Sequence, residues 1–431
     1  MAEDVAGGAA ATAARLVAVL LLAGSISSAS AEWRWSGKAG LNYDFISHDY
    51  YLRAIDTLGI TPDSLAEIKG YSDRIEETGI NLRLELQNQG AVTIALANNS
   101  LLSNEKLRNV TAVRVQWGAL RFVSDAEFKS YGQSDDFSLY QSRLQNSSRL
   151  GLRLLDNSRW EVEISQEFEY TGFDERSAAV YGYRQHESRL RLTRHLAEFS
   201  DLRLNLRYDR RDAYDSSSLD FSRWMADAAY DDIDAGRSIM ASLYAERKNS
   251  VQPGQRDDYY YFNPYLDLVF ALADNLELAP RVEGQIFSYD AQSLATFSHY
   301  RLLTRVELDY HYSLLSTFSF GLGGERLRAF DARYGEQDYR SSQLLLGYET
   351  LASTWFTLNL DSQWGYRNFT AAASEFYTDH WFVRLDLLGD IKLSRRLRFA
   401  LIGGTDFEYH DAKEDDVVVY MLSGNLNYLI K

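Results

Sequence analysis

The stretch WEVEISQEFEY, residues Trp160–Tyr170, decides the fold because its side chains alternate in character along nearly its whole length. One parity is apolar apart from Gln166, and the other carries four carboxylates, at Glu161, Glu163, Glu167 and Glu169. A period of two predicts a β-strand with one apolar face and one polar face. The protein must therefore need an apolar surface backed by acidic groups.

The same alternation recurs through most of the chain. Examples are LRLNLRY (202–208), FTLNLDSQWGY (356–366), LRFALIGGTDFEY (397–409) and YMLSGNLNYLI (420–430). Strands in soluble proteins usually have about five or six residues, whereas crossing a bilayer at a tilt takes about 9 to 11. The longer segments therefore favour strands that cross a membrane.

Short turns separate these segments roughly every 40 residues, a spacing that also suits a four-stranded propeller blade. Each interval holds only two long segments, however, and these are joined by a longer polar connection such as GFDERSAAVYG (172–182). The turns are predicted at 156–158, 197–200, 232–235, 274–275, 314–316, 353–354 and 394–396, with two more near Gly118 and Gly90. Alternating short and long connections are typical of an up-and-down barrel with short periplasmic turns.

We therefore predict an all-β fold, a transmembrane antiparallel up-and-down β-barrel of about 20 strands. If one early hairpin lies outside the membrane, the number is about 18. The apolar run at 16–24 and the sequence Ala29-Ser30-Ala31 predict a cleaved signal peptide over residues 1–31, which leaves 32–431 as the barrel domain. The loop between Ser47 and Arg74 contains ITPDSLAEIKG, which predicts a short helix that acts as a plug or a lid.

Composition excludes several classes of function. The net charge of −16 argues against a nucleic-acid partner, which would require a basic surface. Without any cysteine the chain has no disulfides, no thiolate metal site and no covalent haem attachment. Its seven histidines show no ligand spacing such as HExxH. We expect no metal and no cofactor.

The polar parity is predicted to face a hydrated lumen and the apolar parity to face lipid. Closing the barrel also satisfies every backbone group in hydrocarbon. Pro264 and Pro280 are expected near strand ends, where a lost ladder bond is tolerated. The predicted pore-lining residues are Glu161, Glu163, Glu167, Glu169, Arg189, Arg191, Arg203, Arg207, Arg384 and Asp386. Their opposite charges indicate either a salt-bridged wall or a charge-selecting constriction.

A second set of residues is aromatic and shares the inward parity on three consecutive predicted strands. Rings of this kind either fill the lumen or stack against sugars. The residues of this possible carbohydrate track are Tyr244, Tyr265, Phe287 and Tyr289.

The signal, the alternating segments and the rhythm of turns resemble bacterial outer-membrane β-barrels, specifically the large single-chain porin-like and exporter-like ones. The resemblance implies the outer membrane of a Gram-negative bacterium, contact with its lipid and lipopolysaccharide, and insertion by the barrel-assembly machinery. Such proteins commonly end on an aromatic residue, whereas here Tyr428 is the last aromatic and Lys431 is terminal.

The leading hypothesis is a porin-like channel for polar or charged solutes, or for a polysaccharide during export. The alternative is a structural sleeve that holds a lipoprotein or a multihaem cytochrome across the membrane. An outer-membrane hydrolase is a third interpretation, for which the pairs to examine are His311 with Asp309 and His410 with Glu408. Because no nucleophile motif such as GxSxG is present, we expect no enzyme.

Overall fold

The computed structural model describes most of the chain after the predicted signal peptide. The described ranges are 32–53, 68–89, 92–103, 106–131, 143–173, 182–214, 219–234, 236–251, 258–292, 296–353, 355–370, 377–411 and 416–430. The signal peptide at 1–31 and most of the predicted loop helix lie outside these ranges. Within them, no helix is both long and apolar enough to cross a membrane.

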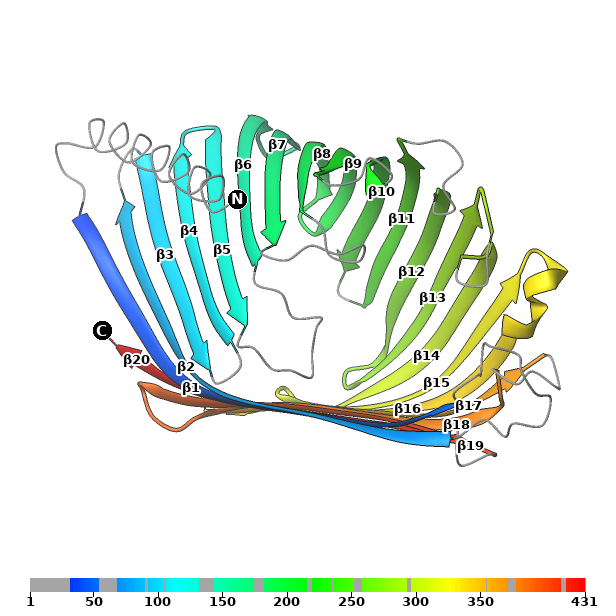
Figure 1. Ribbon diagram of the computed structural model, residues 1–431. Helices are drawn as coiled ribbons and strands as arrows, with labels where there is room; N and C mark the ends of the chain where they lie inside the picture. The colour runs from blue at the N-terminus through cyan, green and yellow to red at the C-terminus, as the bar shows by residue number, and fades with distance from the viewer. Residues whose placement is uncertain are drawn as a thin grey trace.

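Twenty antiparallel strands form a single closed sheet (Figure 1). Each strand pairs with its neighbours in the sequence, and the seam joins β1 to β20 from Gly37 opposite Ile430 to Tyr50 opposite Val417. The strands are β1 (Glu32–Arg53), β2 (Ile68–Gln89), β3 (Val92–Ser103), β4 (Lys106–Trp117), β5 (Leu120–Tyr131), β6 (Arg143–Asp156), β7 (Trp160–Phe173), β8 (Tyr183–Ala197), β9 (Ser200–Ala213), β10 (Phe221–Asp234), β11 (Arg237–Ser250), β12 (Tyr259–Ala273), β13 (Leu276–Tyr289), β14 (His299–Ser313), β15 (Ser316–Ala329), β16 (Tyr339–Ser353), β17 (Phe356–Phe369), β18 (His380–Lys392), β19 (Leu397–His410) and β20 (Val417–Ile430). The prediction of about 20 strands is confirmed, and the alternative of about 18 is wrong.

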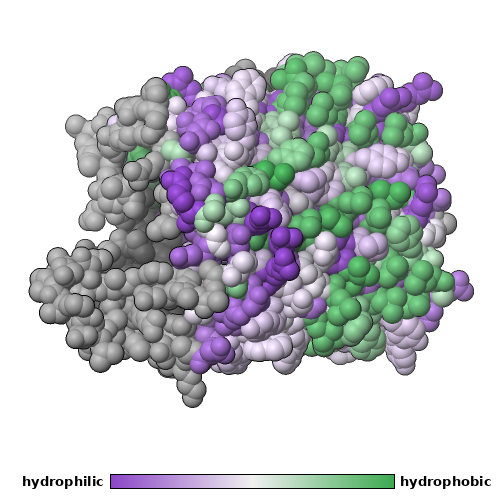
Figure 2. Space-filling view, turned by 90° about the vertical axis from the view of Figure 1, so that its right-hand side faces the viewer, coloured by the Kyte–Doolittle hydropathy of each residue, from purple (hydrophilic) through white to green (hydrophobic). Residues whose placement is uncertain are grey.

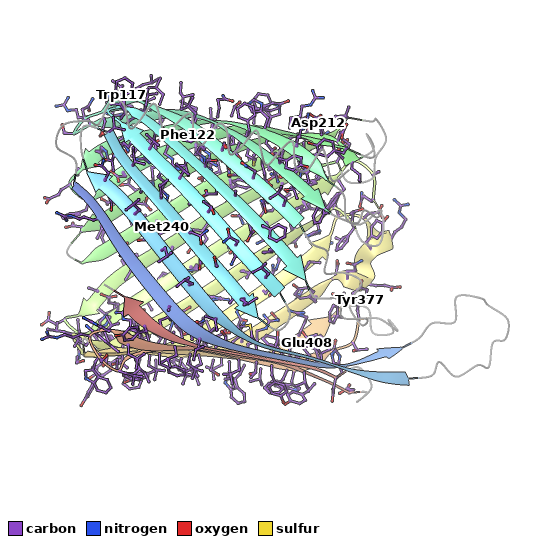
Figure 3. All side chains as sticks on the ribbon, turned by 60° about the vertical axis from the view of Figure 1, so that its left-hand side comes forward. Trp117, Phe122, Asp212, Met240, Tyr377 and Glu408 are labelled. Atoms are coloured by element: carbon purple, nitrogen blue, oxygen red, sulfur yellow. The ribbon has the colours of Figure 1, made fainter. Side chains whose placement is uncertain are left out.

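The first hairpin differs from the prediction. Residues 47–53 and 68–74, expected in a loop, are strand, and they pair from Ser47 opposite Arg74 to Arg53 opposite Ile68. Gly70, expected to end a helix, lies inside β2. Residues 68–78 extend past the end of β3, whose pairing with β2 begins at Gly79. The ends of β1 and β2 accordingly project beyond the rest of the wall (Figure 3).

The short turns lie at one rim and the long connections at the other. Trp117 marks the short-turn rim, and Asp212 and Tyr377 lie at the opposite, long-connection rim (Figure 3). The predicted short turns are confirmed where they are described, although β10 continues through Asp234 and so shortens the turn expected at 232–235. The two-residue turn after β4 requires a positive φ, which Gly118 supplies at 56°.

Side chains satisfy the backbone at both rims. The side-chain carbonyl of Asn157 accepts hydrogen bonds from the N–H groups of Arg159 and Trp160. The Ser394 hydroxyl accepts hydrogen bonds from the N–H groups of the residues at 396 and 397. At the long-connection rim, the residue just before a strand accepts the N–H of the last residue of the preceding strand, as Asp338 does from Ala329 at 2.6 Å. The residues that do this are Asp220, Asp258, Ser298, Asp338, Asp379 and Asp416.

The two prolines lie inside their strands rather than near the ends as expected. Pro264 is the sixth residue of β12 and Pro280 the fifth of β13, and the ladder between these strands skips both positions. The Asn263 amide donates to the Gly284 carbonyl at 2.9 Å, which replaces one missing backbone donor. A Cβ at Gly284 would lie 3.1 Å from the Pro264 ring, so the glycine leaves room for it.

Along most of the described strands one face is mainly apolar and the other mainly polar, and the register places residues of like character opposite each other. The apolar face includes Phe318, Phe320 and Leu322 of β15, which remain largely exposed. The outside of the barrel accordingly shows a broad field of hydrophobic residues over this part of the wall (Figure 2). The other face, called the polar face below, carries most of the charged residues.

A group of polar side chains interrupts the apolar face across β3 to β8. We call this group the polar band; it comprises Asn98, Ser100, Asn109, Thr111, Ser124, Ser148, Gln166, His186 and Ser188. Its members bond mainly to one another, for example Asn109 Nδ2 to Ser100 Oγ at 2.8 Å and Ser124 Oγ to Ser148 Oγ at 2.9 Å. Mutual bonding offsets the cost of placing amides and hydroxyls in an apolar setting. Gln166, the lapse in the alternation of β7, therefore belongs to a wider pattern.

We predict that Gln166→Leu destabilises the barrel, because Gln166 Oε1 is the acceptor for both His186 (2.6 Å) and Ser188 (3.0 Å). Leaving these groups unpaired costs about 1–3 kcal/mol. The measurement is the free energy of unfolding from phospholipid bilayers in guanidinium chloride. The matched control, Gln166→Leu with His186→Leu and Ser188→Ala, should recover most of the loss. Equal stability of wild type and the single variant would contradict the assignment.

Candidate functional site

The polar face is the candidate functional site, and the ladder register fixes its composition. Glu161, Glu163, Glu167 and Glu169 share one face of β7. Arg189 and Arg191 of β8 share that face, as do Arg203 and Arg207 of β9. On the far side of the sheet, Arg384 and Asp386 of β18 share it as well. The predicted residues thus lie on one continuous surface, and their pore-lining role stays a prediction.

Within the described residues, no ion pair joins the glutamates of β7 to the four arginines of β8 and β9. Glu167 pairs instead with Arg149 of β6, whose Nε donates at 2.7 Å. Arg189 pairs with Glu187 on its own strand at 2.6 Å, and Arg203 pairs with Asp231 of β10. Among the described residues, Arg191 and Arg207 make no ion pair. The wall is salt-bridged, but through partners that alternation alone does not select.

The carboxylate Asp209 of β9 lies at the centre of the most buried part of this network. Its side chain is fully buried, and it accepts hydrogen bonds from Arg223 at 2.9 and 3.2 Å and from Gln185 at 2.8 Å. Arg223 also reaches Glu246 of β11 at 3.5 Å. Tyr259 donates to the same Glu246 at 2.7 Å. Five consecutive strands, β8 to β12, are therefore linked through one chain of contacts.

A tyrosine–carboxylate contact recurs every four strands. In each case the first residue of a strand is a tyrosine whose hydroxyl donates to a glutamate of the preceding strand. The pairs are Tyr183 with Glu169, Tyr259 with Glu246 and Tyr339 with Glu325. The first and third tyrosine rings also lie under guanidinium groups, those of Arg211 at 4.1 Å and Arg367 at 4.5 Å. These glutamates are held at the long-connection rim.

The predicted aromatic track is partly assembled. Phe287 and Tyr289 stack with an interplanar angle of 11°, and Tyr244 lies 5.8 Å from Tyr261. Tyr265 makes no ring contact within the described residues; its hydroxyl donates to Asp267 at 2.9 Å. The cluster gains residues that the prediction missed, namely Tyr259, Tyr261 and His299. Tyr261 shares the parity of Tyr265, but it lies within the continuous aromatic run 259–262, where alternation is hidden.

A recess of about 610 Å³ opens over the polar face of β1 to β5. Alanines at 95, 97 and 112 are among its lining residues, and their small side chains leave the space. The arginines that line it are Arg34, Arg83, Arg114 and Arg121. Arg114 and Arg121 are exposed and form no ion pair with any described residue. This basic recess was not predicted, because its only signal in the sequence is an arginine on the polar parity of several strands.

Acidic side chains occupy the polar face of β13 and β14, halfway round the sheet from β3 and β4. They are Glu277, Glu283, Glu307 and Asp309. Glu277 accepts a contact from His311 at 3.4 Å, and Glu283 accepts a hydrogen bond from Asn263 at 3.1 Å. Glu307 and Asp309 have no ion pair in the described part of the chain. The same face of these strands also carries Arg281, Arg301 and Arg305, and of these Arg281 pairs with Asp267 and Arg301 with Glu325. We call Glu307 and Asp309 the acidic sector and Arg114 and Arg121 the basic sector; the two lie on opposite walls.

The histidine pairs proposed for hydrolysis are differently engaged. His311 bonds Thr317 at 3.0 Å rather than Asp309. His410 bonds Thr378 at 2.6 Å, lies 4.5 Å from the His380 ring, and keeps 3.9 Å from Glu408. Across the described ranges, no group of three His, Asp or Glu side chains is placed to hold a metal ion.

No protein-family model matches the chain, and no curated protein sequence matches it. The siderophore receptor PirA from Pseudomonas aeruginosa aligns with 91% of this chain and 80% of its own, at 8% identity and a TM-score of 0.52. OccAB2 from Acinetobacter baumannii aligns with 92% of this chain and 98% of its own, at 9% identity and a TM-score of 0.51. This chain has the fold of large outer-membrane β-barrels. A BenF-like porin from Pseudomonas fluorescens aligns at 12% identity over 93% of this chain and 98% of its own, with a TM-score of 0.48.

The fold predicted from the resemblance is thus confirmed. At such low identity the comparisons establish the barrel fold but not what passes through it. Conclusions about function therefore depend on the distribution of charge on the polar face.

We predict that Arg223→Leu lowers the free energy of unfolding by about 1–3 kcal/mol, because it leaves the buried Asp209 carboxylate without its guanidinium partner. The control is Arg203→Leu. The side chains of Arg203 and Asp231 are 51% and 22% exposed, so their ion pair should contribute less than about 1 kcal/mol. Denaturant unfolding in lipid measures both. Equal losses would show that burial of Asp209 does not matter.

Proposed function

We propose that the protein is a channel in the outer membrane of a Gram-negative bacterium and that polar or charged solutes cross it through the barrel interior. The observation that carries this proposal is the continuous polar face of a closed sheet. Since exposed hydrophobic residues such as Phe320 and Leu322 gather on the outside of the wall seen in Figure 2, we infer that the polar face borders the interior. The predicted residues, from Glu161 on β7 to Asp386 on β18, lie on this face. A charged interior retains water, whereas an empty apolar one would not.

The basic sector on one wall and the acidic sector on the opposite wall support a channel that orients the solutes passing through it. Many charged side chains on the wall form an ion pair with a neighbour, as Glu167 does with Arg149. Among the described residues, Arg114 and Arg121 on one wall form no ion pair, and neither do Glu307 and Asp309 on the other. Charged groups of opposite sign that form no close ion pair on facing walls set up a field across the pore, and rows of such charges act on permeating ions.

We predict that the protein forms stable conducting steps in planar bilayers and that its ion selectivity depends on the two sectors. Arg114→Gln with Arg121→Gln should shift the reversal potential in a salt gradient toward cations. Glu307→Gln with Asp309→Asn should shift it the other way. The control, Arg184→Gln, changes one charge on the apolar face of β8 and should leave the potential unchanged.

A folded barrel that conducts nothing would contradict the open channel. It would direct attention to the sleeve, in which a lipoprotein or cytochrome fills the interior. Conduction with no effect of either double substitution would keep the channel and remove the role of the two sectors.

A second candidate is a channel for carbohydrate chains, favoured by the rings gathered on β11 to β14. Tyr261 and Phe287 stack at 4.3 Å, and Phe287 also stacks on His299 at 5.2 Å. The Glu246 carboxylate lies between the hydroxyls of Tyr244 and Tyr259 beside these rings. Flat aromatic surfaces next to hydrogen-bonding groups suit sugars, which present apolar faces and hydroxyl rims.

We predict that maltoheptaose and cellohexaose block the single-channel current of wild type, because their sugar rings stack on this cluster. Tyr261→Ala with Phe287→Ala should weaken the block several-fold. The matched control is Tyr265→Ala, the predicted track residue that lies outside the ring cluster. Absence of block in wild type, or equal weakening by the control, would remove the carbohydrate interpretation and leave the ion channel untouched.

A further inference from the structure

Three arginines near the long-connection rim stand together on the apolar face. Arg326 and Arg328 lie near the end of β15, and Arg340 is the second residue of β16. Arg326 lies directly opposite Arg340 in the ladder, and Arg328 follows on the same face two residues nearer the rim. We call these residues the arginine trio. Like charges directly opposite each other on a sheet destabilise it unless something lies between them.

Within the described ranges, the arginine trio has no ion pair, hydrogen bond or ring contact. The nearby carboxylates are already engaged. Glu325 accepts from Arg301 at 2.5 Å and from Tyr339. Asp331 holds Arg333 at 2.6 Å, and Asp338 accepts the Ala329 N–H. Asp379 accepts from the Tyr366 hydroxyl, the Asn368 amide and the Phe369 N–H.

The other strand arginines on the apolar face near this rim are not left this way. Arg184 donates to the Tyr214 hydroxyl, and Arg210 pairs with Asp212 at 2.9 Å. Arg247 pairs with Asp290 through two bonds, of 2.7 and 3.0 Å. Its guanidinium holds the pKa of the Asp290 carboxyl below its usual range. The missing anion is therefore specific to the arginine trio.

The surroundings of the trio show what kind of molecule would carry that anion. On β14, Leu302 lies opposite Arg326 and Tyr300 lies opposite Arg328. Farther from the rim, the apolar face of β15 continues with Leu322 and Phe320, both more than half exposed. The Tyr300 ring lies 6.2 Å from that of Phe330. Aliphatic, aromatic and basic side chains follow one another toward the rim, in the order in which acyl chains, interface and headgroups follow in a leaflet.

We propose that the arginine trio binds a phosphate group carried by a lipid of the surrounding leaflet, with the acyl chains against the apolar face below it. Guanidinium groups bind phosphate oxygens through paired, charge-assisted hydrogen bonds. One phosphate between Arg326 and Arg340 converts a repulsive cross-strand pair into a bridged one. The binding goes beyond the proposed channel and does not depend on conduction.

The test titrates the folded full-length barrel in a non-ionic detergent with three probes. These are bisphosphorylated lipid A, the same lipid after removal of its phosphates, and inorganic phosphate. Native mass spectrometry reads the bound lipid and its affinity. The wild type should bind the phosphorylated lipid. R326Q/R328Q/R340Q should bind it about tenfold more weakly.

The matched control is R184Q/R210Q/R247Q, which removes the same number of charges from the same face and rim. Its affinity for the phosphorylated lipid should stay close to that of wild type. Folding of each variant is checked by heat-dependent migration on a gel. If the triple variant of the trio does not fold, Arg340→Gln alone should still weaken binding several-fold, because Arg340 is exposed and has no partner to lose.

Each other outcome overturns part of the proposal. Equal losses in the two triple variants would show only a general effect of charge. Equal affinity for the dephosphorylated lipid would remove the phosphate. If inorganic phosphate alone bound the trio as tightly as the lipid does, the site would be one for a free anion.

Discussion

The structure depends on one constraint: a backbone amide or carbonyl in hydrocarbon must find its partner within the protein. A sheet meets this condition only by closing, and here the seam between β1 and β20 supplies the last ladder. The same constraint explains local details. Where Pro264 removes a donor, the Asn263 amide takes its place, and where strands end at the long-connection rim, Asp338 and its equivalents accept the terminal N–H groups.

Closure also determines how charge is distributed. Once the apolar face lies outside, the charged side chains of twenty strands have to share one interior wall. Many are compensated by a neighbour, as in the chain of contacts from Gln185 through Asp209 and Arg223 to Glu246. Among the described residues that form no ion pair, Arg114 and Arg121 on one side and Glu307 and Asp309 on the other face each other across the interior.

Much of this could be predicted from the sequence because a strand's period of two is a local property. Alternation gave the faces of β7 and β18, and the turn residues gave the number of strands. The ion-pair partners could not be derived in the same way. Parity says that Glu167 and Arg189 share a face, but only the register shows that Glu167 meets Arg149 across one ladder and Glu187 across the other.

Other features were missed because their signals run across strands. In the sequence of β7 alone, Gln166 only interrupts the apolar parity. Its place in the polar band depends on its hydrogen bonds to His186 and Ser188 of β8. The aspartate that precedes Tyr259, Tyr339 and His380 is visible in the sequence, yet its meaning depends on the strand before it. In the first hairpin the segment ITPDSLAEIKG predicted a helix within a loop, whereas in the structure pairing between β1 and β2 extends well into the expected loop.

The seam has a further consequence for how the molecule reaches this state. It joins Gly37 to Ile430 and Tyr50 to Val417, so its partners lie almost a full chain length apart. Every other ladder links consecutive strands and can grow hairpin by hairpin. A sheet assembled in that order keeps two open edges until the last strand arrives, and open edges recruit foreign strands. Contacts of such long range also form slowly. The interval before closure is therefore when this chain is most exposed to aggregation.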